Sequence, residues 1–305
     1  MTRHFLADDD LSPDELIAVL DLADELKTHR RAARLTPGPL QGQSIVVIFE
    51  KNSTRTRLSF EIGISELGAT PIVLDSGNTQ IGRGETIEDT ARVISRFADA
   101  IVIRTYGQDR IEGLAAASSV PVINALTEAY HPCQALADLQ TIRSHFGRLE
   151  GLTLTYVGDG NNVAHSLLLA GAAAGMTVRV GAPDGYQPNP SIVARAAKLG
   201  HVEVVDDPMQ AAKDAHVLYT DVWVSMGDED SIERAAAMQP FQLNAAMLAH
   251  ADPEAVVLHC LPAHREEEIT SEVIDGPRSL VWDQAENRLH AQNALLVSLL
   301  TGRLT

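Results

Sequence analysis

The sequence predicts an α/β fold made of two doubly wound parallel-sheet domains joined by helices. Short apolar runs alternate with helical stretches along the chain, and this alternation is typical of parallel strands connected by crossover helices. The chain has 305 residues, which is more than a usual single domain contains. Its residues are 45% hydrophobic and 4% aromatic, a composition that favours a globular α/β protein over a fibrous or disordered one.

The first domain is expected at residues 1–140. An amphipathic helix is predicted over residues 12–29, because Ser12 can cap it, Pro13 suits its first turn and Glu15 completes a capping box. Apolar residues recur on one face of this helix, as a core-facing helix requires. The strands predicted after it are 44–49, 71–74, 100–104 and 121–124, with helices at 54–67 and 85–98.

The second domain is expected at residues 141–285. Its predicted strands are 152–159, 177–183, 202–206, 216–221 and 256–262, with 280–283 as a candidate sixth strand. Helices predicted at 132–148 and 286–302 could join the domains, and residues 286–305 would complete the first one. Because open α/β sheets bind ligands beyond the carboxyl ends of their strands, we expect the active site in a cleft between the two domains.

Composition argues against several classes of function. The formal net charge is −17, so the protein as a whole would repel nucleic acid and anionic membranes, and neither is expected as a partner. The sequence has no long apolar run and no N-terminal segment resembling a signal peptide, so a cytoplasmic location is expected. Cys133 and Cys260 give no disulfide framework. Because the net charge is negative, an anionic ligand would need a local pocket of arginines.

A polar cluster follows the first predicted strand directly, in the stretch SIVVIFEKNSTRTRLSF at residues 44–60. It offers three hydroxyl groups and two guanidinium groups, from Ser53, Thr54, Thr56, Arg55 and Arg57. The helix predicted after it adds N–H groups that have no partner within the helix. We expect a doubly charged oxyanion here. The glycine-rich run and the lysine of a Walker loop are missing, so a nucleoside triphosphate is not indicated.

Two further polar groups in the first half stand near predicted strand ends. Arg104 closes the strand AIVIR, where a surface arginine would also fit. In the stretch TEAYHPCQALAD, the ring N–H of His131 and the amide of Gln134 could both point at one carbonyl oxygen. His-Pro can equally begin a helix with Gln134 exposed to solvent, so this stretch alone leaves both interpretations open.

The second half carries three comparable groups. GDGNN at residues 158–162 follows a strand, but Val163 replaces the third glycine of a dinucleotide fingerprint, so NAD binding is only weakly indicated. A turn that presents Asn162 to the cleft fits as well. The stretches DVWVSMGDE and HCLPAHREEE contribute Asp221, Ser225, Met226, Cys260 and Leu261. A zinc site built from His259, Cys260 and His264 is an alternative, although the usual four-ligand spacing is missing.

Four of these stretches resemble a known family. FEKNSTRTRLSFE, HPCQALADL, DVWVSMG and HCLPAHR, in this order and with these separations, closely resemble ornithine carbamoyltransferases of the aspartate/ornithine carbamoyltransferase family. The likeness extends over essentially the whole chain. It implies transfer of the carbamoyl group of carbamoyl phosphate to the δ-amine of ornithine, giving citrulline and phosphate, in arginine biosynthesis. It also implies that no metal or organic cofactor is needed.

The resemblance assigns roles to individual residues. It implies a carbamoyl phosphate-binding domain over residues 1–140 with helix 286–305, and an ornithine-binding domain over 141–285. The implied catalytic residues are Arg55, Arg104, His131, Gln134 and Cys260. The implied carbamoyl phosphate contacts are Ser53, Thr54, Arg55, Thr56, Arg57, Gln80, Arg104, His131, Gln134, Cys260, Leu261 and Arg288. The implied ornithine contacts are Asn162, Asp221, Ser225 and Met226. Gln80 matches the residue that reaches a neighbouring subunit's site, which implies a homotrimer or a multiple of one.

Two positions depart from the family pattern. Asn52 stands where many relatives have proline, and Glu266 stands where a glycine is usual. Glu266 puts the conformation of its loop in question, because glycine often adopts angles that other residues resist.

Rival functions stay open at this point. The amine acceptor could instead be putrescine, N-acetylornithine or aspartate. A dinucleotide-dependent oxidoreductase and a catalytically silent binding protein are alternatives from other classes. The sequence also leaves open whether the reaction runs in the biosynthetic or the degradative direction.

Overall fold

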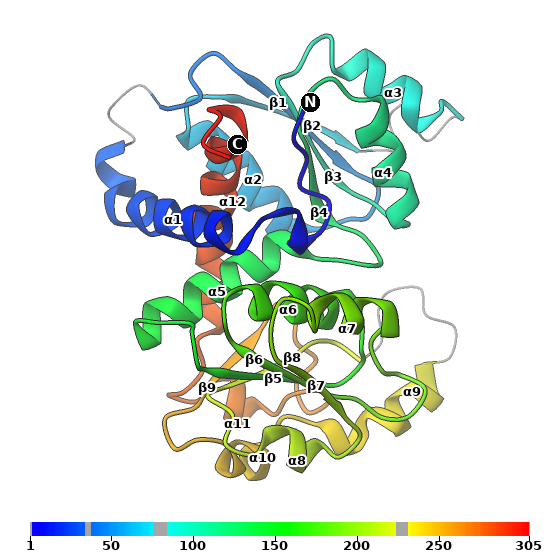
Figure 1. The fold of residues 1–305 in the computed structure, drawn as a ribbon, viewed down its shortest axis with the longest axis vertical. Helices are drawn as coiled ribbons and strands as arrows, with labels where there is room; N and C mark the ends of the chain where they lie inside the picture. The colour runs from blue at the N-terminus through cyan, green and yellow to red at the C-terminus, as the bar shows by residue number, and fades with distance from the viewer. Residues whose placement is uncertain (1, 34–37, 76–83, 224–230, 305) are drawn as a thin grey trace. The chain divides into compact units, whose positions relative to one another are not determined.

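The computed structural model describes residues 2–33, 38–75, 84–223 and 231–304 (Figure 1). The chain divides into two compact units, which are described separately below. The first unit comprises Met1–Gln140 and Asn287–Thr305, and the second comprises Thr141–Glu286. The chain passes from one unit to the other within helix α5 (Pro132–Phe146) and returns within helix α12 (Val281–Leu300).

The first unit contains a parallel sheet with the strand order β2-β1-β3-β4. Its strands are β1 (Ser44–Phe49), β2 (Thr70–Asp75), β3 (Ala100–Arg104) and β4 (Val122–Leu126). Its remaining helices are α1 (Pro13–Ala33), α2 (Thr54–Glu66), α3 (Ile87–Ile94) and α4 (Gln108–Ala117), and a 3-10 turn covers Asp8–Asp10. The order of the strands reverses between β1 and β3, so a ligand of this sheet is expected beyond these two strand ends.

The core of the first unit follows from the period-two alternation of buried strands. Val46 and Ile48 on β1, together with Ile101 and Ile103 on β3, pack with apolar side chains of α3 and α4. Figure 1 shows α3 and α4 on this face of the sheet, and α1, α2 and α12 on the other. Because helices cover both faces of the central strands β1 and β3, these strands are almost entirely apolar between their first and last residues.

The second unit contains a parallel sheet with the strand order β7-β6-β5-β8-β9. Its strands are β5 (Thr153–Val157), β6 (Thr177–Gly181), β7 (Val202–Val205), β8 (Val217–Thr220) and β9 (Val256–His259). Its helices are α6 (Asn162–Ala173), α7 (Pro190–Ala196), α8 (Pro208–Ala212), α9 (Ser231–Met238), α10 (Ala245–His250) and α11 (Ser271–Ile274), with a 3-10 turn at Gln239–Phe241. Here the order reverses between β5 and β8.

Two helical layers cover the second sheet. Figure 1 shows α6 and α7 on one face and α8, α10 and α11 on the other. The second layer closes over a buried cluster that includes Val157, Leu218 and Val257 from the strands, and Leu243 and Met247 from the segment around α10. This packing fixes the positions of β5, β8 and β9, and so of the residues that follow each strand.

The predicted fold class is confirmed, since both units contain a parallel sheet covered by helices. The predicted strand at 280–283 is wrong, because helix α12 begins at Val281. Before that helix, Val257 and Ser279 form a single isolated bridge, and Leu280 N–H donates to Val257 O at 2.9 Å. The apolar residues of this segment therefore form the start of a buried helix. A short apolar run in the sequence does not distinguish such a helix from a buried strand.

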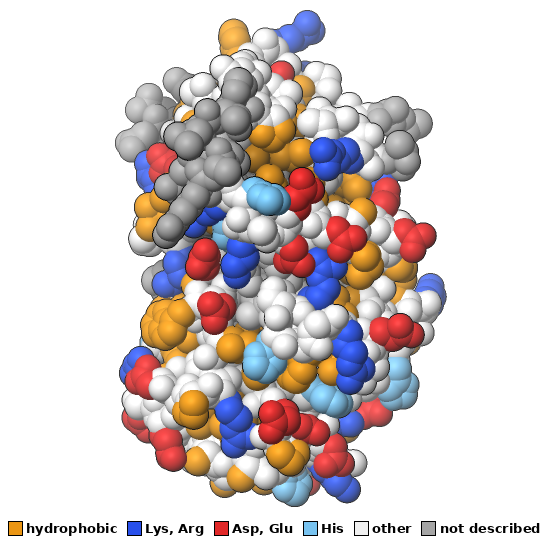
Figure 2. All heavy atoms as spheres, turned by 90° about the vertical axis from the view of Figure 1, so that its left-hand side faces the viewer, with side chains coloured by type: hydrophobic (Ala, Val, Ile, Leu, Met, Phe, Trp, Pro, Cys, Tyr) orange, Lys and Arg blue, Asp and Glu red, His pale blue; other side chains and the backbone are white. Residues whose placement is uncertain are grey.

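Charged side chains of both signs are interspersed on the face drawn in Figure 2. On this face, a binding site for an anion would depend on individually placed arginines rather than on a broad basic surface. Among the described helices, none is both long enough and apolar enough to cross a membrane.

Candidate active site

The first polar group lies at the N-terminus of α2, directly beyond β1. Ser53 is the N-cap of this helix, and its Oγ accepts a hydrogen bond from Thr56 N–H at 3.3 Å. Ser53 Oγ also donates to Thr56 Oγ1 at 2.9 Å. Thr54 is exposed and Arg55 is half-buried on the first turn, where the helix presents N–H groups. A helix N-terminus of this kind attracts anions through its free N–H groups and its dipole.

A chain of buried hydrogen bonds links this helix end to α5 and α12. Arg288 on α12 donates through Nη2 to Thr56 Oγ1 at 2.8 Å and through Nη1 to Gln134 Oε1. Gln134 in turn donates through Nε2 to Asp138 Oδ1 at 2.7 Å. All four side chains are buried, so each bond replaces water that burial has removed. These bonds hold the guanidinium group of Arg288 at a fixed position next to the first turn of α2.

Arg104 and His131 lie near the same guanidinium group. Arg104 ends β3, the neighbour of β1, and His131 immediately precedes α5. Burial holds the pKa of His131 well below its usual value, and the positive charges of Arg288 and Arg104 lower it further. His131 is therefore a neutral imidazole at physiological pH, and it can donate a hydrogen bond to a carbonyl oxygen without bringing a charge of its own.

Glu50 fixes the strand end that carries this group, and sequence reasoning did not single it out. Its carboxylate accepts hydrogen bonds from Arg110 at 2.8 and 2.5 Å and from the Thr105 hydroxyl. Its backbone N–H donates to Arg104 O at 2.9 Å. Burial would raise the pKa of Glu50, but the bonds to Arg110 and Thr105 hold it below its usual value. A charged residue at the end of the apolar run SIVVIF was the signal that could have revealed it.

Arg57 is not brought into this group. Its guanidinium group contacts Glu61 Oε2 at 3.1 Å and Asp75 Oδ2 at 3.3 Å, on an exposed part of α2. The hydrogen bonds to these two acids raise the pKa of Arg57, with Glu61 as the larger cause. The spacing of four residues between Arg57 and Glu61 favours this pairing on a helix and is visible in the sequence. Of the two arginines in the STRTR stretch, Arg57 thus faces the helix surface.

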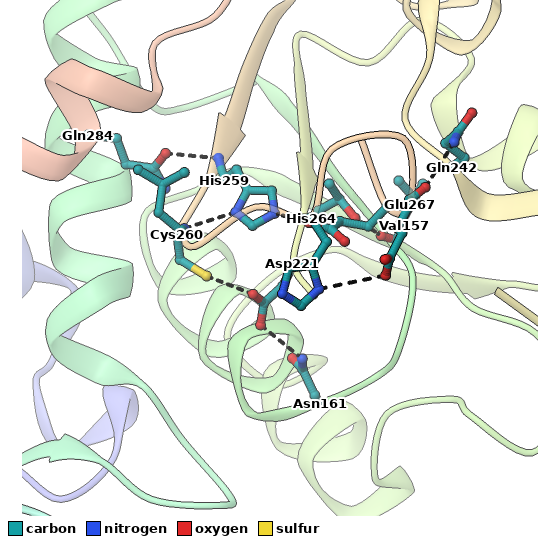
Figure 3. A network of polar contacts seen from close by, with 12 residues as sticks. Val157, Asn161, Asp221, Gln242, His259, Cys260, His264, Glu267 and Gln284 are labelled. Atoms are coloured by element: carbon teal, nitrogen blue, oxygen red, sulfur yellow. Dashed lines mark hydrogen bonds and ion pairs between the residues drawn. The ribbon is translucent and has the colours of Figure 1, made fainter. Parts of the chain in front are cut away.

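The second unit gathers polar side chains beyond β5, β8 and β9. Asp221 follows β8, and its carboxylate accepts a hydrogen bond from Asn161 Nδ2 at 3.1 Å and from Cys260 Sγ at 3.0 Å (Figure 3). Asn161 follows β5 and Cys260 follows β9. Asn162 is the first residue of α6 and is half-buried beside Asn161. The three strand ends therefore meet around one carboxylate, as the strand order β5-β8-β9 requires.

A buried pair supports the loop after β9. His259 Nδ1 accepts a hydrogen bond from Leu261 N–H at 2.9 Å, so the ring proton resides on Nε2 and points at Glu268 Oε1, 3.1 Å away. Glu268 also accepts from His264 N–H at 2.6 Å. Both side chains of the pair are fully buried. His259 and Glu268 thereby hold the backbone of Cys260 and Leu261, a role that sequence reasoning did not assign to them.

Glu266 adopts the left-handed conformation that its usual glycine would favour, with a φ of 67°. Its N–H donates to Ile269 O at 2.9 Å, and its Oε1 accepts from Ser271 N–H at 2.9 Å. These bonds offset part of the steric cost of a side chain in this region. The loop conformation is thus the one a glycine would adopt, although the residue differs. Asn52 is exposed just before the N-cap of α2.

Three of the predicted contact residues cannot be placed. Gln80, Ser225 and Met226 lie outside the described residues.

Metal ligands are available at two places in the described part of the second unit. Asp221, His259 and Cys260 form one group and His264, Glu267 and Glu268 another, with the ligand atoms of each within 4.8 Å of one another. His264 thus falls in a different group from the two residues with which it was considered as a zinc ligand. In the first group, the potential ligand atoms already form hydrogen bonds. Cys260 Sγ bonds to Asp221, and the two ring nitrogens of His259 bond to Leu261 N–H and to Glu268. Cys133 and Cys260 are not joined in a disulfide, and burial raises the pKa of Cys133 to about 12.

Comparisons with known proteins decide the family. A model described as "Aspartate/ornithine carbamoyltransferase, carbamoyl-P binding domain" matches residues 3–144, and one described as "Aspartate/ornithine carbamoyltransferase, Asp/Orn binding domain" matches residues 150–299. The chain belongs to the aspartate/ornithine carbamoyltransferase family. The predicted resemblance is thereby confirmed, and so is the prediction that the chain is a carbamoyltransferase.

Individual members of the aspartate/ornithine carbamoyltransferase family resemble the chain over nearly its full length. An ornithine carbamoyltransferase of Parafrankia sp. is 60% identical over 304 residues, which cover 98% of this chain and 96% of the relative. One of Acidothermus cellulolyticus is 60% identical over 306 residues, covering 98% and 97%. The solved structure of ornithine carbamoyltransferase from Pyrococcus furiosus superposes with a TM-score of 0.93 at 46% identity, covering 99% of this chain and 98% of that one.

Proposed function

We propose that this chain transfers the carbamoyl group of carbamoyl phosphate to the δ-amine of L-ornithine, giving L-citrulline and phosphate. The observation that carries the proposal is its 60% identity to ornithine carbamoyltransferases across nearly the full length of both chains. The chemistry of the two polar groups agrees with it. One group offers cations and neutral donors to an anion, and the other offers a carboxylate to an amine substrate.

The first unit is proposed to bind carbamoyl phosphate. Negative charge develops on the carbonyl oxygen and on the departing phosphate when the amine attacks. Ser53, Thr54, Arg55 and Thr56 would hold the phosphate at the N-terminus of α2, while Arg104, His131 and Gln134 would hold the carbonyl oxygen. Arg288 would complete the group from below, since it already bonds to Thr56 and Gln134. Each donor fixed before the reaction can lower the barrier by about 3 kcal/mol.

The second unit is proposed to bind ornithine. The α-ammonium and α-carboxylate of ornithine call for an acid and for amide donors, which Asp221 and Asn162 supply, with Ser225 and Met226 as further proposed contacts. Cys260 and Leu261 stand on the loop that His259 and Glu268 hold. The δ-amine must be uncharged to attack, and a free alkylamine has a pKa of about 10.4. We therefore expect the rate to rise from neutral towards alkaline pH.

A citrulline assay with carbamoyl phosphate and four acceptors tests the function. L-ornithine is expected to be turned over fastest, because putrescine lacks the α-carboxylate and α-ammonium groups that Asp221 and Asn162 would bind. N-acetylornithine and aspartate are the other two acceptors. Faster turnover of any of these three would overturn the assignment to ornithine. A rate that stays flat between neutral and mildly alkaline pH would contradict the requirement for an uncharged amine.

The active assembly is proposed to be a homotrimer in which Gln80 completes a neighbouring subunit's site. An exposed apolar surface supports self-association, since Leu58 and Ile62 on α2 and Ile72 on the edge strand β2 are 52%, 43% and 40% exposed. Patches of this kind mark protein interfaces. Mixing inactive Gln80→Ala and Arg55→Ala chains tests the sharing of sites. Hybrid trimers should regain activity, because some sites receive both intact residues, and mixtures that stay inactive would contradict it.

A cytoplasmic location and a place in arginine biosynthesis complete the proposal. Both are suggested by the name of the relatives, ornithine carbamoyltransferase, which is that of a metabolic enzyme. Restoration of growth without arginine in a bacterium lacking its own ornithine carbamoyltransferase would support the biosynthetic direction. Failure of an expressed, active enzyme to restore growth would count against it.

A further inference from the structure

The side chain of Asn161 joins two strand ends in the second unit. Its Oδ1 accepts hydrogen bonds from the backbone N–H groups of Val163 at 2.9 Å and Ala164 at 3.3 Å, which makes it the N-cap of α6. Its Nδ2 donates to Asp221 Oδ2 at 3.1 Å. Figure 3 shows the amide of Asn161 directed at the Asp221 carboxylate. Asn161, four residues beyond the end of β5, thus reaches Asp221, the residue directly after β8.

The orientation of this amide is determined by its neighbours. The oxygen faces two backbone donors and the hydroxyl of Tyr156, 3.5 Å away. The nitrogen faces a carboxylate oxygen, which only accepts. Exchanging the oxygen and the nitrogen of the amide would break the bonds to Val163, Ala164 and Asp221, because the first two only donate and the third only accepts. A single arrangement therefore satisfies the helix and Asp221 together.

We infer that Asn161 is a positioning residue, which holds the Asp221 carboxylate in the orientation that receives the amine substrate. This inference rests on the proposed function, in which Asp221 and Asn162 contact ornithine. Asp221 Oδ1 accepts from Cys260 Sγ at 3.0 Å while Oδ2 accepts from Asn161, so separate donors fix its two oxygens. A carboxylate held in this way is oriented before substrate arrives, and it loses little freedom on binding. Asn161 acts through Asp221 rather than on the substrate.

The competing explanation is that Asn161 only caps α6. Aspartate and serine cap helices about as well as asparagine does. Asn161→Ser keeps a capping oxygen, but its short side chain has no second donor that reaches Asp221. Asn161→Asp keeps the cap and places a second carboxylate against the first, where like charges repel. A residue that only caps would tolerate both changes, whereas a residue that positions Asp221 would tolerate neither.

Steady-state kinetics of both variants separate these explanations. We expect kcat/KM for ornithine to fall by about tenfold to a hundredfold in Asn161→Ser, because one hydrogen bond to a charged group is lost. The fall should be larger in Asn161→Asp. KM for carbamoyl phosphate should stay at the parent value, and Tm should change by only a few degrees. Unchanged ornithine kinetics in Asn161→Ser would overturn the inference, and so would an equal loss for both substrates accompanied by a large fall in Tm.

A double-mutant cycle tests whether Asn161 acts through Asp221. In an Asp221→Asn background, the further change Asn161→Ser should alter kcat/KM for ornithine by less than about twofold, because the carboxylate it holds is already gone. Full additivity of the two changes would overturn the inference.

A crystal structure of the Asn161→Ser variant gives a readout that needs no activity. We expect helix α6 to begin at the same residue and the Asp221 carboxylate to rotate away from Cys260 Sγ. An Asp221 side chain that keeps its 3.0 Å contact with Cys260 would overturn the inference even in an active enzyme. A parent enzyme without ornithine activity would overturn the proposed function, and the position of Asp221 in the variant would still decide the role of Asn161.

Discussion

The polar groups of the two units differ in charge and in the way they are supported. In the first unit, Arg104 and Arg288 lie beside the neutral His131, and burial together with these two cations keeps its pKa low. In the second unit, the central groups are the carboxylates of Asp221 and Glu268, which accept hydrogen bonds from Asn161, Cys260 and His259. Both sheets are parallel, but we propose that the edge of the first binds an anion, here called the anion-binding edge, and that the edge of the second binds an amine.

This difference shows how an acidic protein can bind a doubly charged anion. The net charge of −17 sets an unfavourable field for the whole molecule. In the first unit, Arg288 is only 3% exposed and donates hydrogen bonds to Thr56 and Gln134, which fix its guanidinium group inside the protein. Arg57, by contrast, is exposed and pairs with Glu61 and Asp75 on the helix surface.

Removing a cation from the first unit should have the largest effect. Arg104→Gln should lower kcat about a hundredfold to a thousandfold, because it removes a donor aimed at the carbonyl oxygen where charge develops. Arg96→Gln is the matched control, since Arg96 is exposed and lies outside the proposed site. Its kcat should equal that of the parent. An Arg104→Gln enzyme with near-parental kcat, measured by citrulline formation, would break the assignment of the anion-binding edge.

A change at Arg288 tests whether each unit binds a different substrate. Arg288→Lys keeps the charge, but a lysine cannot bond to Thr56 and Gln134 at once with the same geometry. We expect kcat/KM for carbamoyl phosphate to fall about tenfold while KM for ornithine stays unchanged.

Asp221→Asn is the counterpart in the second unit and should raise KM for ornithine alone. A variant that affects both substrates equally would contradict the separation.

The neutral His131 should make stability depend on pH. Its pKa is lowered well below 6.5 in the folded chain, so below about pH 6.5 the unfolded chain binds a proton that the folded chain excludes. This difference should lower the free energy of unfolding progressively as the pH falls below about 6.5. Urea unfolding at a fixed protein concentration should show a shallower pH dependence in His131→Asn, whereas the exposed His29→Asn should keep the parental slope. Equal slopes in all three proteins would refute a neutral His131.

The smallest effect is expected in the second unit, at Glu266. Both variants lose the side-chain bond to Ser271, but glycine adopts a φ of 67° without strain, whereas alanine keeps the strain. We expect the Tm of Glu266→Ala to lie about 2–4 °C below that of Glu266→Gly. Calorimetry of the two variants side by side provides the measurement. A Glu266→Ala protein as stable as Glu266→Gly would mean that the loop changes its conformation.

The sequence was a good guide where function follows strand ends. Ser53, Arg104 and Asp221 each follow or close a short apolar run, and these continuous apolar runs are visible in the sequence because the strands are buried on both faces. It was a poor guide to long-range partners, because nothing local shows that Arg288 bonds to Thr56, 232 residues away, or to Gln134, 154 residues away. The bond between Asn161 and Asp221, 60 residues apart, is hidden for the same reason.

The bond between Arg288 and Thr56 has a consequence for biosynthesis of the protein. The segment that supplies Arg288 follows the entire second unit in the chain, although it belongs to the first unit. During translation, the helix that carries Thr56 emerges from the ribosome well before its guanidinium partner has been made. Domains generally fold in the order of their synthesis. The anion-binding edge therefore lacks Arg288 until the whole second unit has been synthesised.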